Sequence, residues 1–181
     1  MANGGRFSTG SRGRRSRAAG FTLIELMIAI AVLAVLLALA VPNFNDASLS
    51  ARLNGFANSI VAAAQVARSE AIKRNATITL CASANGSSCA GSGGWEQGWI
   101  VLNEATDPDT VLQHQQGLPS EFNVTQTGGT AALNFLPTVV GTTTATLTVC
   151  RSDPVGSEER VVTINGTGSA YVTITTTGTC S

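Results

Sequence analysis

The chain has 181 residues, of which 44% are hydrophobic, 12% are charged and 5% are aromatic, and its formal net charge is zero. So much apolar content with so little charge excludes a disordered, charge-solvated chain, and the zero net charge argues against a generally basic nucleic-acid binder. The length is that of one ordinary domain with an appendage, and the few aromatic residues predict a small aliphatic core.

The first twenty residues form a basic segment that predicts no packed structure. They contain five arginines and no acidic residue, with glycine and serine between them: Arg6, Arg12, Arg14, Arg15 and Arg17. Such a segment has nothing to bury, so we expect it to stay outside any core.

Residues 21–41 are almost entirely apolar, with 19 apolar residues of 21 and only Thr22 and Glu25 as exceptions. At the helical rise this run is about 31 Å long, enough to cross the hydrocarbon core of a bilayer. The arginines before it predict a cytoplasmic N-terminus and place the rest of the chain across the membrane. An ordinary secretory signal cut near residues 38–40 is the competing interpretation, but the run exceeds the usual length of about 7–15 residues.

Glu25 is the informative exception in this run. A carboxylate at the centre of a membrane helix costs roughly 2.5–3.5 kcal/mol, and somewhat less near an end, unless it is paired. The residues alone leave two interpretations open: a boundary carboxylate that reaches the lipid headgroups, or the partner of a charge supplied by another subunit.

The junction at residues 20–27, Gly-Phe-Thr-Leu-Ile-Glu-Leu-Met, resembles the cleavage motif of type IV prepilins and pseudopilins. The resemblance implies that a membrane prepilin peptidase cuts after Gly20 and methylates the new amino terminus of Phe21. The basic leader, residues 1–20, would be removed, and residues 21–42 would remain as a transmembrane and filament-core helix.

The same resemblance gives two further residues a role. Glu25 is the fifth residue counted from Phe21, the position of the family's glutamate, which implies pairing with the free amine of a neighbouring subunit during filament assembly. Two costly buried charges would then satisfy each other. Pro42 falls where many family members carry a helix-bending proline, and its missing amide hydrogen predicts a kink.

Beyond Pro42 the apolar residues step by three and four, which predicts one face of an amphipathic helix; they are Leu49, Leu53, Phe56, Ile60, Ala64, Ala67 and Ala71. We therefore expect one helix from Phe21 to Arg74, with residues 43–76 as its amphipathic half. Glu70 and Arg74 are spaced for an i,i+4 ion pair.

Residues 77–181 are rich in threonine and valine, which suits half-buried strands and predicts a periplasmic β-rich head. The expected strands are residues 77–81, 98–102, 133–136, 144–150, 160–164 and 171–175. Asn165-Gly166 predicts a hairpin between the last two. The expected fold class is α+β: a type IV pilin-like fold, with a long N-terminal helix packed on an antiparallel β-sheet head.

A narrower resemblance extends into this head. Residues 67–75 (Ala-Arg-Ser-Glu-Ala-Ile-Lys-Arg-Asn) and 95–102 (Trp-Glu-Gln-Gly-Trp-Ile-Val-Leu) are similar to the GspH and FimT/FimU branch of minor pilins and pseudopilins. We interpret Trp95 and Trp99 as domain core or as part of a sheet edge.

Four cysteines, Cys81, Cys89, Cys150 and Cys180, lie on the predicted periplasmic side, where disulfides persist. They allow three connectivities. We favour Cys81–Cys89, which closes a short loop, and Cys150–Cys180, which resembles the C-terminal disulfide loop of pilins. The lack of a Cys-x-x-Cys pair and the single histidine argue against a zinc site.

The remaining candidate sites are weak. His114 stands alone among glutamines and is interpreted as a surface-loop residue. Asp107-Pro108-Asp109 could ligate Ca²⁺, but two carboxylates are few for a site of six to eight oxygens, so a solvated turn is favoured. No nucleophile or acid–base constellation is recognisable, so we expect no enzyme activity and no cofactor.

The function expected from these observations is that of a minor pilin, which assembles into a type IV pilus or primes or caps it. The alternatives are a GspH-like pseudopilin of type II secretion and a FimT-like DNA-binding minor pilin. Residues 75–181 carry two basic against eight acidic residues, so no nucleic-acid partner is expected. The expected partners are other pilins, prepilin peptidase and the inner membrane, with the C-terminal domain in the periplasm.

Overall fold

The structure is a computed structural model that describes residues 20–176, except for 92–93, 107, 128–131, 139–140 and 154–155. The side chains of residues 39–45 are also outside the description. The chain forms two compact units, residues 1–44 and residues 45–181. The expected leader, residues 1–20, lies outside the described residues apart from Gly20.

Helix α1 spans Leu23–Arg74 and is the first element of the chain. It begins two residues after the predicted start and ends at the predicted residue. Asn75 ends it with a left-handed φ of 50°, a conformation that asparagine tolerates better than most residues. The helix is assigned without a break through Pro42, whose side chain lies outside the described ones, so the expected kink stays a prediction.

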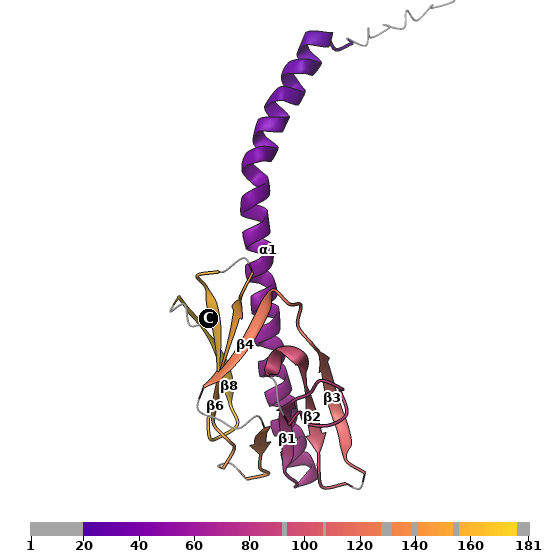
Figure 1. The fold of residues 1–181 in the computed structure, drawn as a ribbon, viewed down its shortest axis with the longest axis vertical. Helices are drawn as coiled ribbons and strands as arrows, with labels where there is room; N and C mark the ends of the chain where they lie inside the picture. Colours follow the sequence, from indigo (N-terminus) through magenta and orange to yellow (C-terminus); the bar gives the residue numbers. More distant parts are fainter. Residues whose placement is uncertain are drawn as a thin grey trace, which may run out of the picture. The chain divides into compact units, whose positions relative to one another are not determined.

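The described residues of the head form two four-stranded antiparallel sheets, where the sequence indicates one (Figure 1). The first sheet has the order β3-β2-β1-β5 and the second the order β4-β6-β7-β8. Their bounds are β1 Ile78–Ala82, β2 Gly98–Asn103, β3 Thr110–Gln116, β4 Phe122–Thr127, β5 Ala132–Phe135, β6 Ala145–Arg151, β7 Glu159–Ile164 and β8 Ala170–Thr175. The α+β, pilin-like fold class is confirmed.

Strands β3 and β4 are the two that the sequence did not predict. β3 ends in Gln-His-Gln-Gln and lies at an edge of the first sheet, so it lacks the apolar alternation of a half-buried strand. The interpretation of His114 as a loop residue is therefore wrong: it is exposed, but it lies on β3 opposite Ile100 of β2.

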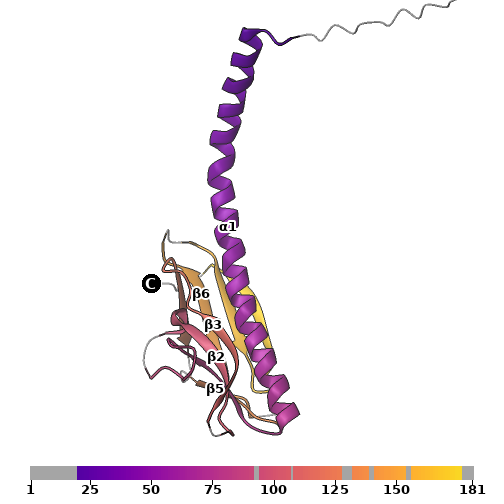
Figure 2. The same ribbon diagram turned by 90° about the vertical axis from the view of Figure 1, so that its right-hand side faces the viewer.

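A face of small residues places the second half of α1 against both sheets (Figure 2). Ala57, Ala64, Ala67 and Ala71 are fully buried in one core cluster with residues of both sheets, among them Leu80 of β1. Because alanine adds only a methyl group, the helix backbone can approach the strands closely. The predicted apolar face is confirmed.

A short helix, η1 (Trp95–Gln97), lies between β1 and β2 in the chain and contacts β4 of the second sheet. The indole Nε1 of Trp95 donates a hydrogen bond to Gln126 Oε1 of β4 over 2.8 Å, and Trp99 on β2 is fully buried. The interpretation of both tryptophans as core residues is confirmed. Gly98, between them, has a φ of 107°, and a Cβ there would lie 2.5 Å from the carbonyl oxygen of Gln115, so the turn requires glycine.

The turn between β7 and β8 is the predicted hairpin. The side-chain oxygen of Asn165 accepts hydrogen bonds from the backbone amides of Thr167 and Ser169, and Gly168 takes a left-handed φ of 78°. Asparagine and glycine supply the local bonding and the backbone freedom that such a turn needs.

Candidate assembly sites

The expected cleavage junction lies at the exposed start of α1. Gly20 and Phe21 precede the helix, and the Phe21 side chain is 84% exposed. The amide of Glu25 donates to Thr22 Oγ1 over 3.2 Å, and the amide of Thr22 donates to Glu25 Oε2 over 3.5 Å. This reciprocal pair is a capping box, which satisfies two amides that a helix start leaves without partners.

The capping box gives Glu25 a role that the sequence reasoning missed, although Thr-x-x-Glu before an apolar run is a recognisable signature of it. The carboxylate turns back toward the first turn, where the partial positive charge of the helix start favours an anion. The expected pairing of Glu25 with the free amine of a neighbouring subunit stays a prediction.

The first half of α1 exposes large aliphatic side chains on every side. All described residues from 20 to 38 are exposed, including Leu23, Ile28, Leu33 and Leu36. Among the residues that the structure describes, no helix meets the length and apolar character of a membrane crossing. The membrane span expected at residues 21–42 includes side chains outside that description and stays a prediction.

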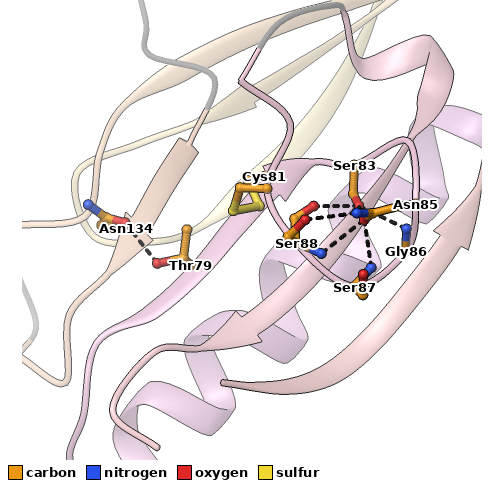
Figure 3. Close-up of a disulfide and its surroundings, with 9 residues drawn as sticks. Thr79, Cys81, Ser83, Asn85, Gly86, Ser87, Ser88 and Asn134 are labelled. Atoms are coloured by element: carbon orange, nitrogen blue, oxygen red, sulfur yellow. Dashed lines mark hydrogen bonds between the residues drawn. A yellow bond between two sulfur atoms is a disulfide. The ribbon is translucent and has the colours of Figure 1, made fainter. Parts of the chain in front are cut away.

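The predicted disulfide between Cys81 and Cys89 is confirmed, with Cα atoms 5.6 Å apart (Figure 3). It closes a small polar loop between β1 and η1. Inside this loop Asn85 Oδ1 accepts hydrogen bonds from the amides of Ser87 and Ser88, over 2.9 and 3.0 Å, as Figure 3 shows. The covalent bond and these hydrogen bonds restrict the conformations open to the loop.

The structure describes only one cysteine of the second predicted disulfide. Cys150 on β6 is fully buried and disulfide-bonded. Its predicted partner, Cys180, lies outside the described residues.

Two arginines form hydrogen bonds between the second half of α1 and the rest of the head. Arg68 donates from Nη1 to the carbonyl oxygens of Leu136 and Thr138, over 2.8 and 2.7 Å. Arg160 of β7 is only 3% exposed and donates from Nε to Asn54 Oδ1 on the helix. Hydrogen bonds from a charged donor are stronger than neutral ones, so these contacts stabilise the packing of the helix on the head.

The end of α1 carries the predicted ion pair. The hydrogen bond from Arg74 to Glu70, together with one from Lys73 to the same carboxylate, holds the pKa of Glu70 below its ordinary value of 4.5. The positive side chains also suit the negative end of the helix dipole.

The described residues contain no group of three or more metal-binding side chains. Of the weak calcium candidate, Asp107 lies outside the described residues and Asp109 is exposed.

Comparisons with known families agree with this architecture. The family model for the type II transport protein GspH matches residues 57–168, more than half of the chain. The chain belongs to the GspH family. The model of the prokaryotic N-terminal methylation motif matches residues 15–41, which include the junction and the capping box.

Two solved structures of the type IV minor pilin FimU of Pseudomonas aeruginosa share the fold of this GspH-family chain. Both are 19% identical to it; the first matches with a TM-score of 0.51 over 66% of this chain, the second with 0.52 over 70%. Each match covers 91% of the FimU chain. Membership makes the chain a structural, non-enzymatic pilin or pseudopilin and implies processing by prepilin peptidase, assembly with other pilins and anchoring in the inner membrane.

Proposed function

We propose that this protein is a minor pilin of a type IV pilus that primes or caps the filament, or is incorporated into it, through its N-terminal helix. The observation that carries this proposal is the exposed first half of α1, which is aliphatic on all sides and begins at a capped junction with Glu25. A helix that is apolar all round needs cover from lipid or from other apolar helices. A single-pass inner-membrane precursor with a periplasmic head provides the first, and a filament core the second.

Processing is the first step that this proposal requires. Cleavage after Gly20 removes a leader with five arginines and leaves Phe21 as an N-methylated amino terminus. Mass spectrometry of the mature protein from the producing bacterium tests this step. A mature chain that starts elsewhere than at Phe21 would refute it.

The choice of a pilus rests on the fold shared with FimU, which is a type IV minor pilin. The second candidate, a pseudopilin of type II secretion, is favoured by the family model that covers residues 57–168. Deleting the gene and measuring both surface pili and secreted exoproteins separates the two. Loss of pili with normal secretion supports the pilus, and the reverse outcome supports the secretion machine.

DNA binding is the weakest alternative. The two basic residues of the segment 75–181, Arg151 and Arg160, are both largely buried, and Arg160 is bonded within the protein. Phosphate binding needs exposed positive charge. A fluorescence titration with duplex DNA at low salt should show no binding; salt-sensitive micromolar binding would reverse this ranking.

We also propose the disulfide Cys150–Cys180. The register of the second sheet pairs Thr175 of β8 with Glu159 of β7, next to Arg160, which pairs with Val149 of β6. Cys150 thus lies about two strand spacings, roughly 10 Å, from the end of β8, a distance that the residues after Thr175 can span. Non-reducing peptide mapping should recover one peptide that contains both cysteines.

A further inference from the structure

The outer edge of β8 presents a row of backbone groups that no described strand uses. β8 is the last strand of the second sheet and pairs with β7 alone. At the hairpin the amide of Asn165 donates to the carbonyl oxygen of Ser169, which makes these two residues a hydrogen-bonded pair. Such pairs alternate along an antiparallel ladder. The N–H and C=O groups of Ala170, Val172 and Ile174 therefore point away from β7, toward the open edge.

The side chains of β8 are exposed as well. In the described part of the unit 45–181, three large apolar side chains are exposed: Tyr171 and Ile174 on β8, and Ile72 on α1. Tyr171 is 51% exposed and Ile174 is 64% exposed. Residues 161–181 contain no charged residue and no proline. This edge thus lacks the charges and prolines with which proteins usually protect an edge strand from pairing.

The other three sheet edges differ from that of β8. The pairing of β3 with β2 shifts in register after Val101, which interrupts a regular ladder. β5 is covered by Thr143, whose amide donates to the carbonyl oxygen of Asn134 over 3.0 Å. On β4 the amide of Val124 donates to the side chain of Asn123 over 2.8 Å. Among the strands that the structure describes, β8 alone combines a regular open edge with exposed large apolar side chains.

The chemistry of this edge selects an extended strand as its occupant. N–H and C=O groups that alternate at strand spacing are matched by another backbone in the β conformation. A charged side chain laid against the uncharged β8 would lose water without gaining a partner. Aromatic and β-branched side chains would instead gain cross-strand contacts with Tyr171 and Ile174. The edge therefore fits an uncharged extended segment that is rich in such residues.

We propose that an uncharged extended segment of another protein adds to β8 as the fifth strand of the second sheet. Such strand addition is independent of the choice between a pilus and a pseudopilus. The last residues of the chain itself are not the occupant, because the disulfide Cys150–Cys180 proposed above draws them across β7 toward β6.

A second copy of β8 is a poorer occupant. β8 runs back along α1, because Arg160, which pairs with Ile174, donates to Asn54. Gly168, at the other end of β8, lies against Arg68, with 2.8 Å between a Cβ at that position and the arginine Cδ. Antiparallel pairing of two β8 strands would set the second halves of α1 in opposite directions, whereas chains anchored in one membrane share one direction. Parallel pairing avoids this conflict but is less stable per residue.

Photo-cross-linking from two positions tests for an added strand. The full chain, with a photoreactive phenylalanine analogue at Tyr171 or at Thr173, is produced in the native bacterium. Both side chains lie on the same face of β8, since successive side chains of a strand alternate between faces. We expect both positions to label one segment of another protein, at residues two apart. The analogue at Ile72 is the control and should not label that segment.

The labelled residues decide between the occupants. Labelling within β8 of a second copy would overturn the proposal in favour of self-association. Labelling of residues 177–181 of the same chain would assign the edge to the C-terminal segment. Absence of labelling, or labelled residues without the spacing of two, would exclude an added strand.

Variants of the edge complete the test. Ile174→Pro removes an outward amide and an exposed side chain but no hydrogen bond to β7, a position where an edge strand tolerates proline. It should lower the cross-link yield from position 171 roughly tenfold, on the scale of one lost backbone hydrogen bond and its side-chain contacts. Ile174→Lys should act in the same direction, because an edge lysine opposes pairing.

Ile72→Lys is the matched control, since it places the same charge at the other exposed large apolar residue of the head. It should leave the cross-link from position 171 unchanged. Denaturant unfolding in detergent should give the same midpoint for Ile174→Lys and Ile72→Lys. Undiminished cross-linking in both Ile174 variants would refute the strand addition.

Discussion

The two halves of α1 present opposite surfaces although they belong to one helix. In the described part of the first half, every side chain is exposed and most are large aliphatics such as Ile28 and Leu36. In the second half, alanines such as Ala64 and Ala67 are fully buried against the sheets, and the exposed residues are mainly polar or small, with Ile72 as the large apolar exception. The exposed large apolar side chains need cover from outside the chain, whereas the small ones are already buried within it.

The largest expected effect comes from a charge on the buried face. Ala67→Asp places an unpaired carboxylate in the core and should lower the free energy of unfolding of the head by roughly 3–5 kcal/mol. The control Ala62→Asp, on the exposed face, should change it by no more than about 0.5 kcal/mol. Denaturant unfolding of the full chain in detergent measures both; equal effects would contradict the division of the helix into two faces.

An aspartate in the first half of α1 should affect membrane insertion rather than the folding stability of the head. Leu36→Asp should disfavour membrane insertion by about 3 kcal/mol because a carboxylate would enter the hydrocarbon core. The unfolding free energy of the head should stay unchanged. Carbonate extraction of membranes, run beside the unfolding measurement, checks both parts. A variant that remains fully in the membrane fraction would contradict the expected span.

A larger side chain on the buried alanine face should also destabilise the head, although less than a charge does. Ala64→Leu adds bulk where the helix contacts the strands, and overpacking of this kind costs about 1–3 kcal/mol of folding stability. Ala62→Leu adds the same bulk on the exposed face and should be close to neutral. The midpoint of denaturant unfolding compares the two variants, and equal midpoints would show that the alanine face is not packed.

The capping box sharpens the comparison at the other end of the helix. Thr22→Val removes the hydroxyl that accepts the amide of Glu25, which should destabilise the first turn by about 1 kcal/mol. Thr22→Ser retains the hydroxyl and serves as the control. Amide hydrogen exchange of residues 23–26 in detergent reports the change, while exchange in the head should stay the same.

The smallest expected effect concerns Glu70 near the end of α1. Its pKa is lowered by Arg74, so the ionised carboxylate stabilises the folded state above the ordinary pKa of 4.5, and this contribution is lost as the pH falls through the lowered pKa. Glu70→Gln should therefore be slightly less stable than the unchanged protein at pH 7 and equal to it at pH 2. A difference that persists unchanged at pH 2 would contradict the pairing.

The elements that could be predicted from the sequence are those whose pattern is local. The spacing of apolar residues predicted the buried face of α1, and the threonine- and valine-rich runs predicted six strands. Strand β3 could not be predicted, because its Gln-rich end is held by hydrogen bonds to β2 at a sheet edge and not by burial. The division into two sheets was missed together with β3 and β4.

The candidate sites divide in the same way, between local sequence patterns and contacts that only the folded chain creates. The junction at Gly20 and Phe21 is contiguous in sequence, and the pair Cys81–Cys89 closes a short loop, so both were accessible to motif reasoning. Arg160 and Arg151 have partners about a hundred positions away in the sequence, Asn54 and Asp46, which only the folded chain brings close to them. From the sequence alone, both arginines entered only the charge balance of the head.

The positions of the tryptophans also determine how this protein can be observed. The chain has two, Trp95 and Trp99, and both are buried in the head beside the joint between the sheets. Intrinsic fluorescence therefore reports the head alone and is silent about the first half of α1. A spectral shift during assembly would mean that the head itself rearranges, so one optical signal can distinguish docking of a rigid subunit from remodelling of its core.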